Sequence, residues 1–402
     1  MLEEKATFIV KKLIEAGHIA YFAGGWVRDY LRKEASQDID IASSAKPEEV
    51  MQLFDRCVEV GLSFGVVRVI FEEDVFEVAS FRSDGAYVNG RQPTSIVYCD
   101  PKSDALRRDF TINGMFYDPL TKEIFDYVGG REDLKKGLIR AIGDPWQRFE
   151  EDRLRILRAV RFSARFSFPI EAKTKKAIEA SIEKLFPAVS VERIWQELKL
   201  MLEDANFAQA LQLLLELGIF QKIFPGNLPS EKSLALLAKQ VSKTDAVLVL
   251  MQLFLDLNLQ KRLEICDFLK MSGREKALVK LLDEASCLLQ DSQASLYDWA
   301  HFYTKEGAFA ILELLSLHQD HPESFLTEKE KEKNRLASYI DRILKKKPLI
   351  NAKNLLEKGI LKGPLMGQLL KEAERISICK EIEDPKVLLD LLQNSPLWPE
   401  DL

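Results

Sequence analysis

The stretch Gly24-Gly25-Trp26-Val27-Arg28-Asp29, followed by Gln37-Asp38-Ile39-Asp40-Ile41, carries the most informative pattern in this chain. In an extended segment side chains alternate between two faces, so the two aspartates project the same way while the two isoleucines face a core. The glycine pair opens a short helical stretch, Trp26 to Lys33, and free backbone N–H groups at a helix start attract phosphate. The pattern predicts a carboxylate pair beside a phosphate-binding turn.

Two carboxylates on one face can hold a divalent metal. Mg²⁺ prefers oxygen ligands and keeps waters and substrate phosphates in its shell, so few protein carboxylates suffice when the ligand is a nucleoside triphosphate. Paired metals would activate an attacking hydroxyl and hold the leaving pyrophosphate. An Asp-x-Asp pattern alone is weak evidence, because two solvated carboxylates at a strand end would look the same. Other motifs in the chain are needed to distinguish a metal site from a solvated carboxylate pair.

The composition is that of a soluble, globular protein. With 402 residues the chain can form two or more domains, and 47% apolar and 30% charged residues are ordinary proportions. No run approaches the roughly 18 apolar residues of a membrane span, and the acidic start does not resemble a secretory signal. We therefore expect a cytosolic protein. The five cysteines form no C-x-x-C pair, which favours buried thiols over a disulfide frame or a zinc site.

Local charge is more informative than the net charge of −6, which does not indicate nucleic-acid binding. Six arginines crowd eighteen residues: Arg148, Arg153, Arg155, Arg158, Arg161 and Arg165. A charged helix whose arginines pair with the nearby Glu150, Glu151 and Asp152 is the simpler explanation of this cluster.

Hydrophobic patterning predicts an α+β chain in which a compact α/β region is followed by helices only. Up to about residue 130, β-like runs at 19–23, 38–42, 66–71, 75–81, 114–117 and 123–127 alternate with helices near 4–16, 26–33 and 47–55. From about residue 145 apolar residues recur at three- and four-residue spacing, which indicates helices to the end.

Three further segments strengthen the aspartate motif. Glu77, in a second strand-like run, could stand beside the pair as a third carboxylate or be an ordinary edge-strand glutamate. The segment Arg107-Arg108-Asp109-Phe110-Thr111-Ile112-Asn113 concentrates cations, an acceptor and an amide before a strand. The third segment, Glu151-Asp152-Arg153-Leu154-Arg155, is expected to open a helix.

On that helix Asp152 and Arg155 would be i, i+3 neighbours. Asp152 can accept a hydrogen bond from an exocyclic amino group, and Arg155 can donate one to the ring nitrogen beside it. Cytosine and adenine both offer that pair of groups, whereas uracil and guanine present a carbonyl and an N–H. The alternative is a plain salt bridge between the two side chains.

Together these segments resemble the class II tRNA nucleotidyltransferases and bacterial poly(A) polymerases of the nucleotidyltransferase superfamily. The matching stretches are 24–29 with 38–40, 107–113, 126–130 and 151–162, and the resemblance is dense over residues 20–225 and thinner beyond. It implies a nucleotidyltransferase head at residues 1–135 and a neck with nucleotide-recognition helices at 136–225. A helical body at 226–320 and a helical, tRNA-binding tail at 321–402 would follow.

The resemblance also implies roles for individual residues. Asp38 and Asp40 would bind Mg²⁺, Asp152 and Arg155 would read the incoming base, and Arg108 and Arg158 would lie near the triphosphate. Glu77, predicted from its strand and not from the resemblance, would be a further catalytic carboxylate. The nucleotide-binding set would comprise Gly25, Arg28, Arg108, Asp109, Asn113, Asp152, Arg155, Arg158 and Arg161. Gly114 departs from the family pattern, in which alanine is usual, and we expect a local packing effect there without loss of chemistry.

The activity implied is template-independent addition of C, C and A to the tRNA 3′ end from CTP and ATP. Addition of A or CC alone and polyadenylation are the alternatives. Residues 82–93 resemble the flexible loop of CCA- and A-adding enzymes, which argues against a CC-only enzyme. Residues 355–367 resemble the tRNA-binding tail, although a helix start at Pro364 would read the same. There is no long basic C-terminal extension such as many poly(A) polymerases carry.

A rival from another class is an RNA-binding protein with a decayed transferase head. It is disfavoured because the aspartates and the segment from Glu151 to Arg155 are all present.

Overall fold

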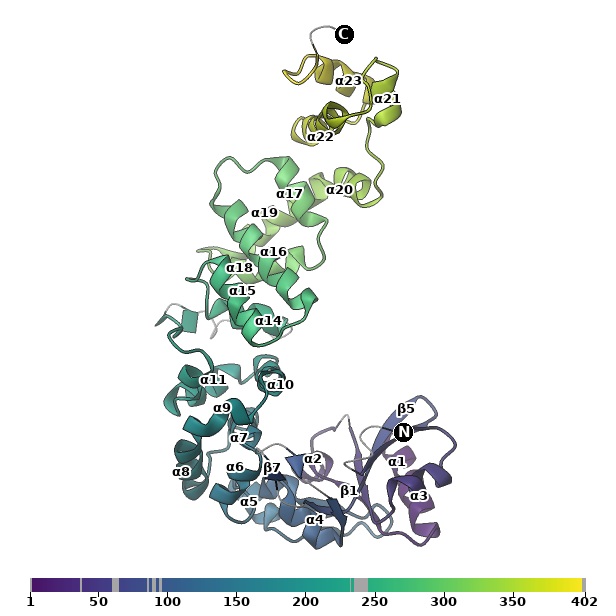
Figure 1. Ribbon diagram of the computed structural model, residues 1–402, viewed down its shortest axis with the longest axis vertical. Coiled ribbons are helices and arrows are strands. Elements are labelled where there is room, and N and C mark those ends of the chain that lie inside the picture. Colours follow the sequence, from purple (N-terminus) through teal and green to yellow (C-terminus); the bar gives the residue numbers. More distant parts are fainter. Residues whose placement is uncertain are drawn as a thin grey trace. The chain divides into compact units, whose positions relative to one another are not determined.

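The computed structural model describes residues 2–36, 38–59, 65–84, 87–88, 92–93, 96–231, 233–234 and 245–399. The chain divides into two compact units, Met1–Leu228 and Pro229–Leu402, which run from purple to teal and from teal to yellow in Figure 1. The finer division into head, neck, body and tail stays a prediction.

The first unit contains a mixed seven-stranded sheet in the order β11-β10-β1-β2-β5-β4-β3. Its strands are β1 (Ala20–Ala23), β2 (Asp40–Ser43), β3 (Cys57–Glu59), β4 (Val66–Phe71), β5 (Asp74–Ser80), β10 (Met115–Tyr117) and β11 (Ile124–Asp126). β2 and β5 are parallel, with Ile41 opposite Val78, and the other neighbouring pairs are antiparallel. Because β5 lies between β2 and β4, the expectation that Glu77 could sit on an edge strand is wrong.

Three helices complete the core around this sheet: α1 (Leu2–Glu15), α2 (Gly25–Arg32) and α3 (Pro47–Leu53). Ile9 and Leu13 of α1, four residues apart and hence on one face, are fully buried with Phe22 and Ile41 of the sheet. The predicted α/β head is confirmed; the ends of the predicted elements are shifted by one or two residues, and β3 was not predicted.

The sequence prediction missed several short elements after β5. They are β6 (Arg82–Asp84), paired with β9 (Ile96–Tyr98), β7 (Tyr87–Val88), paired with β8 (Gln92–Pro93), α4 (Pro101–Arg107), the 3₁₀ turn η2 (Thr111–Asn113) and α5 (Gly130–Lys136). The start of α4 was readable, because Asp100 accepts from the N–H groups of Lys102 and Ser103 and Pro101 fits a first turn. In the loop expected at 82–93, residues 85–86 and 89–91 lie outside the described part.

The rest of the first unit is helical, as predicted. Its helices are α6 (Pro145–Glu151), α7 (Leu154–Phe166), α8 (Ala172–Ser181), the 3₁₀ turn η3 (Ile182–Lys184), α9 (Leu185–Ala188), α10 (Val191–Leu202), α11 (Phe207–Glu216) and α12 (Ile219–Ile223). α7 is buried over most of its length, and both α10 and α11 pack against it.

The described part of the second unit is built from helices. They are α14 (Ala246–Gln252), α15 (Leu259–Phe268), α16 (Gly273–Gln290), α17 (Leu296–Tyr303), α18 (Ala308–Ser316), α19 (Pro322–Arg335), α20 (Ala337–Leu344), α21 (Ala352–Leu356), α22 (Pro364–Cys379) and α23 (Pro385–Gln393). Ser272 and Ser295 start α16 and α17 as capping boxes. None of the described helices is long and apolar enough to cross a membrane.

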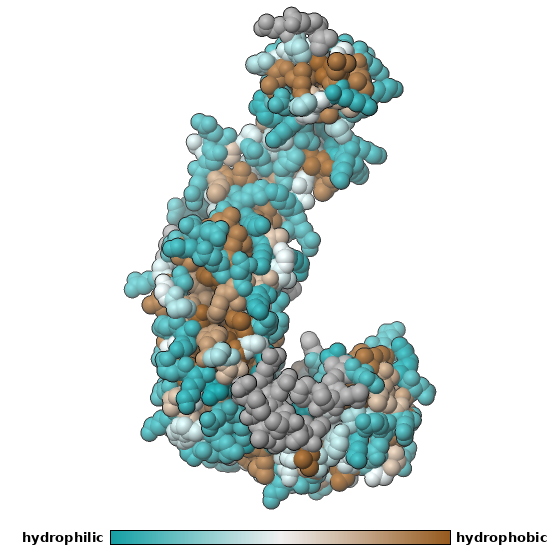
Figure 2. All heavy atoms as spheres, viewed as in Figure 1, coloured by the Kyte–Doolittle hydropathy of each residue, from teal (hydrophilic) through white to brown (hydrophobic). Residues whose placement is uncertain are grey.

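The last three helices share an apolar cluster that includes Ile350, Leu369 and Leu392. Figure 2 shows hydrophobic atoms reaching the surface over this part of the chain, where Leu361 is 82% exposed. All five cysteines are free, and the expectation of buried thiols holds for Cys266 but not for the exposed Cys287.

Candidate active site

The residues predicted for the site all line one cleft of about 1030 Å³ in the first unit. They are Asp38, Asp40, Glu77, Gly25, Arg28, Arg108, Asp109, Asn113, Asp152, Arg155, Arg158 and Arg161. The structure thus brings together side chains from the sheet, α2, η2 and α7 that the sequence spreads over more than a hundred residues.

The turn into α2 needs a glycine at position 24 for two reasons. Gly24 has φ +67° and ψ −125°, a conformation that L side chains rarely adopt. A Cβ there would lie 3.3 Å from Nη1 of Arg108 and 4.0 Å from Oδ2 of Asp40. The absence of a side chain therefore lets a guanidinium and a carboxylate approach the start of α2 together.

The aspartate pair has the alternation predicted from the sequence. Ile39 and Ile41 are buried, while Asp38 and Asp40 are exposed in the cleft. Desolvation within the cleft raises the pKa of Asp40; the carboxylates of Glu77 and Asp38 raise it further, and Arg108 opposes them. This end of the cleft therefore carries uncompensated negative charge.

Such a donor set fits a divalent cation, which would relieve the repulsion between the carboxylates. Among the residues that the structure describes, no group of three or more His, Cys, Asp or Glu side chains is placed to hold a metal ion. Glu77 lines the cleft, but its Oε1 also pairs with Nη2 of Arg68 at 2.7 Å. The observed arrangement accordingly suits a two-carboxylate site.

Arg28 lies buried beneath the same turn. Its Nε and Nη2 donate to the two carboxylate oxygens of Asp29 over 2.8 and 3.0 Å, and its Nη1 donates to Oδ1 of Asn113 over 2.6 Å. The guanidinium also stacks on Phe166 of α7, with 4.5 Å to the ring centroid. Arg28 and Asn113 therefore join α2 to η2, and both are largely occupied by protein partners.

Asp104, which the sequence did not predict, does not line the cleft but holds two arginines that do. It is 1% exposed and accepts from Arg107 and Arg108. Burial alone would raise the pKa of Asp104, but the two guanidinium groups hold it below its ordinary value. The sequence signal that could have found this contact is the spacing of the two arginines, three and four residues after Asp104, which places them on the same helix face.

Arg158 and Arg161 belong to an ion-pair network with Asp109 and Glu197. Arg158 Nη2 lies 2.6 Å from Oδ2 of Asp109, and Arg161 Nε lies 2.7 Å from Oε2 of Glu197. Burial acts to raise the pKa of Asp109, yet Arg158 keeps it below the ordinary value. The network joins the segment before η2 to α7 and α10. The expected pairing with nearby acids is therefore found for Arg148 and Arg155, which pair with Glu151, but not for Arg158 and Arg161.

The predicted helix start at Glu151 is also wrong. Glu151 ends α6, Asp152 is extended with φ −145° and ψ 103°, and α7 begins at Leu154. The Asp152 carboxylate accepts from the Leu154 N–H over 3.0 Å, and its carbonyl accepts from the Arg155 N–H over 3.1 Å. Asp152 therefore stands at a junction between two helices because it satisfies N–H groups at the start of the second.

The two proposed base-reading residues pair with other partners in place of each other. Arg155 is buried, and its Nη1 donates to Oε2 of Glu151 while its Nη2 donates to the carbonyl of Arg107, each over 2.9 Å. Asp152 is paired with Arg193 of α10 at 2.7 Å. The intrahelical salt bridge considered as the alternative is not what these residues form.

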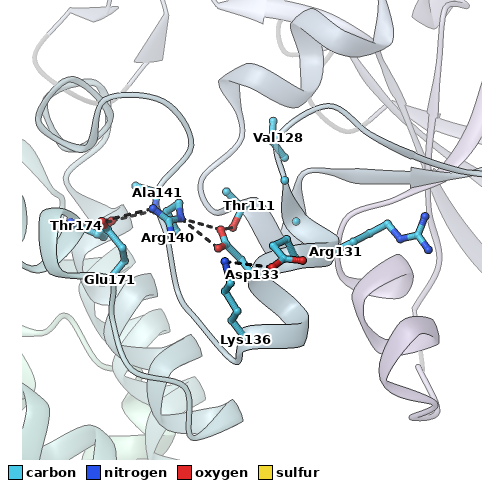
Figure 3. A network of polar contacts seen from close by, with 12 residues as sticks. Thr111, Val128, Arg131, Asp133, Lys136, Arg140, Ala141, Glu171 and Thr174 are labelled. Atoms are coloured by element: carbon cyan, nitrogen blue, oxygen red, sulfur yellow. Dashed lines mark hydrogen bonds and ion pairs between the residues drawn. The ribbon is translucent and has the colours of Figure 1, made fainter.

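A second polar network contacts η2 through Thr111 (Figure 3). Asp133 of α5 accepts from Oγ1 of Thr111 over 2.8 Å and from Nε of Arg140 over 2.9 Å. Asp126 accepts from the N–H groups of four successive residues, 128 to 131, and so fixes the start of α5. A Cβ at Gly130 would lie 2.2 Å from the carbonyl oxygen of Thr111. The segment 126–130 is therefore built to bring α5 against η2.

The departure at Gly114 has a packing cause, as expected. A Cβ at that position would lie 2.7 Å from Cγ2 of Val128 and 3.0 Å from Cδ1 of Ile142. These two side chains fill the volume that an alanine would need.

Two family models match this chain. The model described as "Poly A polymerase head domain" matches residues 20–140, and "Probable RNA and SrmB- binding site of polymerase A" matches residues 167–228. Both matches fall within the first unit; the first includes the sheet and the cleft motifs up to Asn113, the second includes α10, and the motif at 151–162 lies between them.

Curated proteins and solved structures extend the match to nearly the whole chain. The CCA-adding enzyme of Pediococcus pentosaceus is 32% identical over 399 residues, covering 96% of each chain, and that of Bacillus subtilis is 41% identical over 223 residues, covering 55% of each. The crystal structure of the Bacillus stearothermophilus CCA-adding enzyme in complex with CTP matches with a TM-score of 0.82 and 27% identity over 97% of this chain and 98% of that one. The sequence, the fold and the cleft agree: this chain belongs to the family of CCA-adding enzymes, which are nucleotidyltransferases.

Proposed function

We propose that this chain adds C, C and A in turn to the 3′ end of tRNA, using CTP and ATP without a nucleic-acid template. One observation carries the proposal: a carboxylate pair suited to metal and a pair of groups suited to the edges of C and A line the same cleft. The relatives matched over nearly the whole chain are CCA-adding enzymes, which supports the same reaction.

The aspartate end would carry the chemistry. Asp38 and Asp40 would hold Mg²⁺, which when bound lowers the pKa of the attacking 3′-hydroxyl and balances charge on the leaving pyrophosphate. The N–H groups at the start of α2 and the guanidinium of Arg108 lie beside these carboxylates and would bind the triphosphate. Glu77 adds negative charge next to Asp40.

The other end would select the base. Asp152 would accept from the N4 amino group of cytosine or the N6 amino group of adenine. Arg155 would donate to the adjacent ring nitrogen, N3 or N1 respectively. Uracil and guanine would present a carbonyl oxygen to the Asp152 carboxylate, and that repulsion excludes them.

The remaining residues of the cleft would position these two groups. Arg158, Arg161 and Arg28 are held by acid or amide partners, so their contribution to nucleotide binding is expected to be electrostatic and orienting. Asp109 and Asn113 would fix η2 between the two ends of the cleft.

Incubation of the purified protein with tRNA lacking its CCA end, and with each nucleotide singly and in combination, tests the proposal. The expected result is CC from CTP alone, A only after CC, and a stop after three nucleotides. Extension with ATP only on tRNA that already ends in CC would indicate an A-adding enzyme. Continued addition of A would indicate a poly(A) polymerase. Neither alternative is favoured by the full-length relatives.

We also propose that the C-terminal helices bind tRNA, chiefly through phosphates. Lys353, Lys358 and Lys362 are exposed there. Their replacement by alanine should weaken tRNA binding and reduce the slope of log affinity against log salt by roughly 2–3 units. The matched control replaces three exposed lysines of the first unit, Lys11, Lys135 and Lys136, by alanine. Equal salt slopes in the two triple variants would show that the C-terminal lysines do not bind tRNA.

A cytosolic location, expected from the sequence, stays a prediction.

A further inference from the structure

An arginine of α10 forms a bidentate ion pair with the proposed base-reading aspartate. Arg193 donates from Nη1 to Oδ1 of Asp152 over 3.2 Å and from Nη2 to Oδ2 over 2.7 Å. The two side chains are 30% and 19% exposed, so the pair is only partly screened by solvent. A guanidinium that meets both oxygens of a carboxylate fixes the plane of the carboxylate as well as its position.

Asp152 keeps acceptor capacity in this arrangement. A carboxylate offers about four lone-pair sites. Three of them are used, because Oδ1 accepts from the Leu154 N–H and from Arg193 and Oδ2 accepts from Arg193 alone. The open site is therefore on Oδ2, in a residue that lines the cleft.

α10, which carries Arg193, is fixed in place by packing and by an ion pair. Trp195 and Leu198 are buried, and Glu197, one helical turn beyond Arg193, pairs with Arg161 of α7 at 2.7 Å. α10 is thus tied to the helix that carries Arg155. Asp152 is consequently held from α7 and α10, whereas the guanidinium of Arg155 is held by Glu151 of α6 and the carbonyl of Arg107.

We propose that Arg193 is a positioning residue for base selection. By holding both oxygens of Asp152, it keeps an acceptor directed at the exocyclic amino group of the incoming base. The inference rests on the proposed role of Asp152. Without Arg193 the carboxylate would keep only the Leu154 N–H and could rotate away, so that the repulsion against a base carbonyl would weaken.

Single-turnover incorporation of CTP, ATP, UTP and GTP by the full-length protein on tRNA lacking CCA tests the inference. Arg193→Ala should lower the preference for C and A over U and G by about tenfold or more, the effect of losing one fixed hydrogen bond of the edge. Arg193→Lys keeps a cation but lacks the planar fork, and it should lower the preference by a smaller factor. Arg262→Lys, in the Arg262–Asp283 pair of the second unit, should leave the preference unchanged.

The ratio of incorporation rates separates positioning from a purely structural role. An arginine that only stabilised the fold would slow all four nucleotides by one factor and leave the ratio as in wild type, which would overturn the inference. If Arg193→Ala does not fold, the ratio in Arg193→Lys decides in the same way.

Asp152→Ala separates this inference from the proposed function. If Asp152→Ala relaxes base preference and the Arg193 variants do not, only the positioning role of Arg193 is overturned. If Asp152→Ala leaves the preference unchanged, base reading by Asp152 is overturned and the role of Arg193 with it. The Asp152→Ala protein retains Arg193 as a cation without its carboxylate, so the double variant with Arg193→Ala should accept UTP and GTP less readily than Asp152→Ala alone.

Discussion

The two ends of the cleft balance charge in opposite ways. At the aspartate end, Asp38 and Asp40 have no ion-pair partner among the residues that the structure describes, and neighbouring carboxylates add to the effect of desolvation on Asp40. At the base-reading end Asp152, Arg155 and Arg158 each have a bonded partner of opposite charge. The first end is suited to an added cation, and the second presents groups that the protein has already oriented.

Asp40→Asn should produce the largest loss of activity. Removing one ligand of a charge-stabilising site typically costs about 10²–10³ in rate, and we expect a loss of that size for C and A addition alike. The melting temperature of the metal-free protein should be unchanged or slightly raised, because the substitution removes a carboxylate that repels its neighbours. Asp144→Asn, at an exposed site outside the cleft, is the control. Activity within about tenfold of wild type would take Asp40 out of the metal site.

Gly24→Ala should come next. The strain of a side chain at φ +67° costs about 1–3 kcal/mol, and the added Cβ would press on Arg108. Gly143 also has a positive φ, +72°, but nothing lies within 4 Å of its Cβ position, so Gly143→Ala tests strain without the clash. Melting curves should shift for both variants, and kcat should fall much further for Gly24→Ala. Equal losses of kcat would show that the approach of Arg108 is unimportant.

Arg155→Ala should weaken C and A addition to the same extent. It would leave the ring nitrogen without a donor in a partly dry pocket, at a cost of about 1–3 kcal/mol for either base. Single-turnover rates with CTP and ATP measure this, and their ratio should stay at the wild-type value. A loss confined to one nucleotide would contradict a shared base-reading edge.

The smallest expected effect is in the pH dependence of folding stability. The carboxylates at the two ends of the cleft should change the stability at neutral pH in opposite directions. The folded-state pKa of Asp109 is lowered, so its contribution to stability is present above the ordinary value of 3.8 and lost as pH falls through the lower folded value. The pKa of Asp40 is raised, so Asp40 reduces stability at neutral pH, and this cost disappears as pH falls to 3.8. Asp109→Asn should therefore lower and Asp40→Asn slightly raise the melting temperature at pH 7. The Asp40 difference should vanish as pH falls to 3.8, and the Asp109 difference should shrink only as pH falls through its lowered folded pKa. Shifts of melting temperature of the same sign at pH 7 would contradict the contrast.

The sequence predicted the members of the cleft well because its signals were local. The alternation in Asp38-Ile39-Asp40-Ile41 and the glycine pair each follow from short-range backbone geometry, and the resemblance supplied their order. The strand register, which places Glu77 beside Asp40 in the interior of the sheet, depends on pairing between distant segments. No local pattern contains that information.

Two errors have identifiable causes. The break between α6 and α7 was missed because no glycine or proline marks it; the only signal was an aspartate two residues before Leu154, a position from which it can cap a helix. Arg193 was missed because it lies 41 residues from Asp152, in a helix whose apolar spacing is ordinary. Long-range ion pairs of this kind appear only when two helices are seen packed together.

The close packing around Gly114 has a consequence for the divergence of such enzymes. Positions 114, 128 and 142 share one volume, so the identity of each residue limits the other two. Alanine at 114 should be harmful beside Val128 and Ile142 but acceptable once one of them is shortened, for example by Val128→Ala. A relative could change from glycine with two large neighbours to alanine with a smaller neighbour only through a destabilised single variant. The residues at the three positions are therefore expected to covary among relatives.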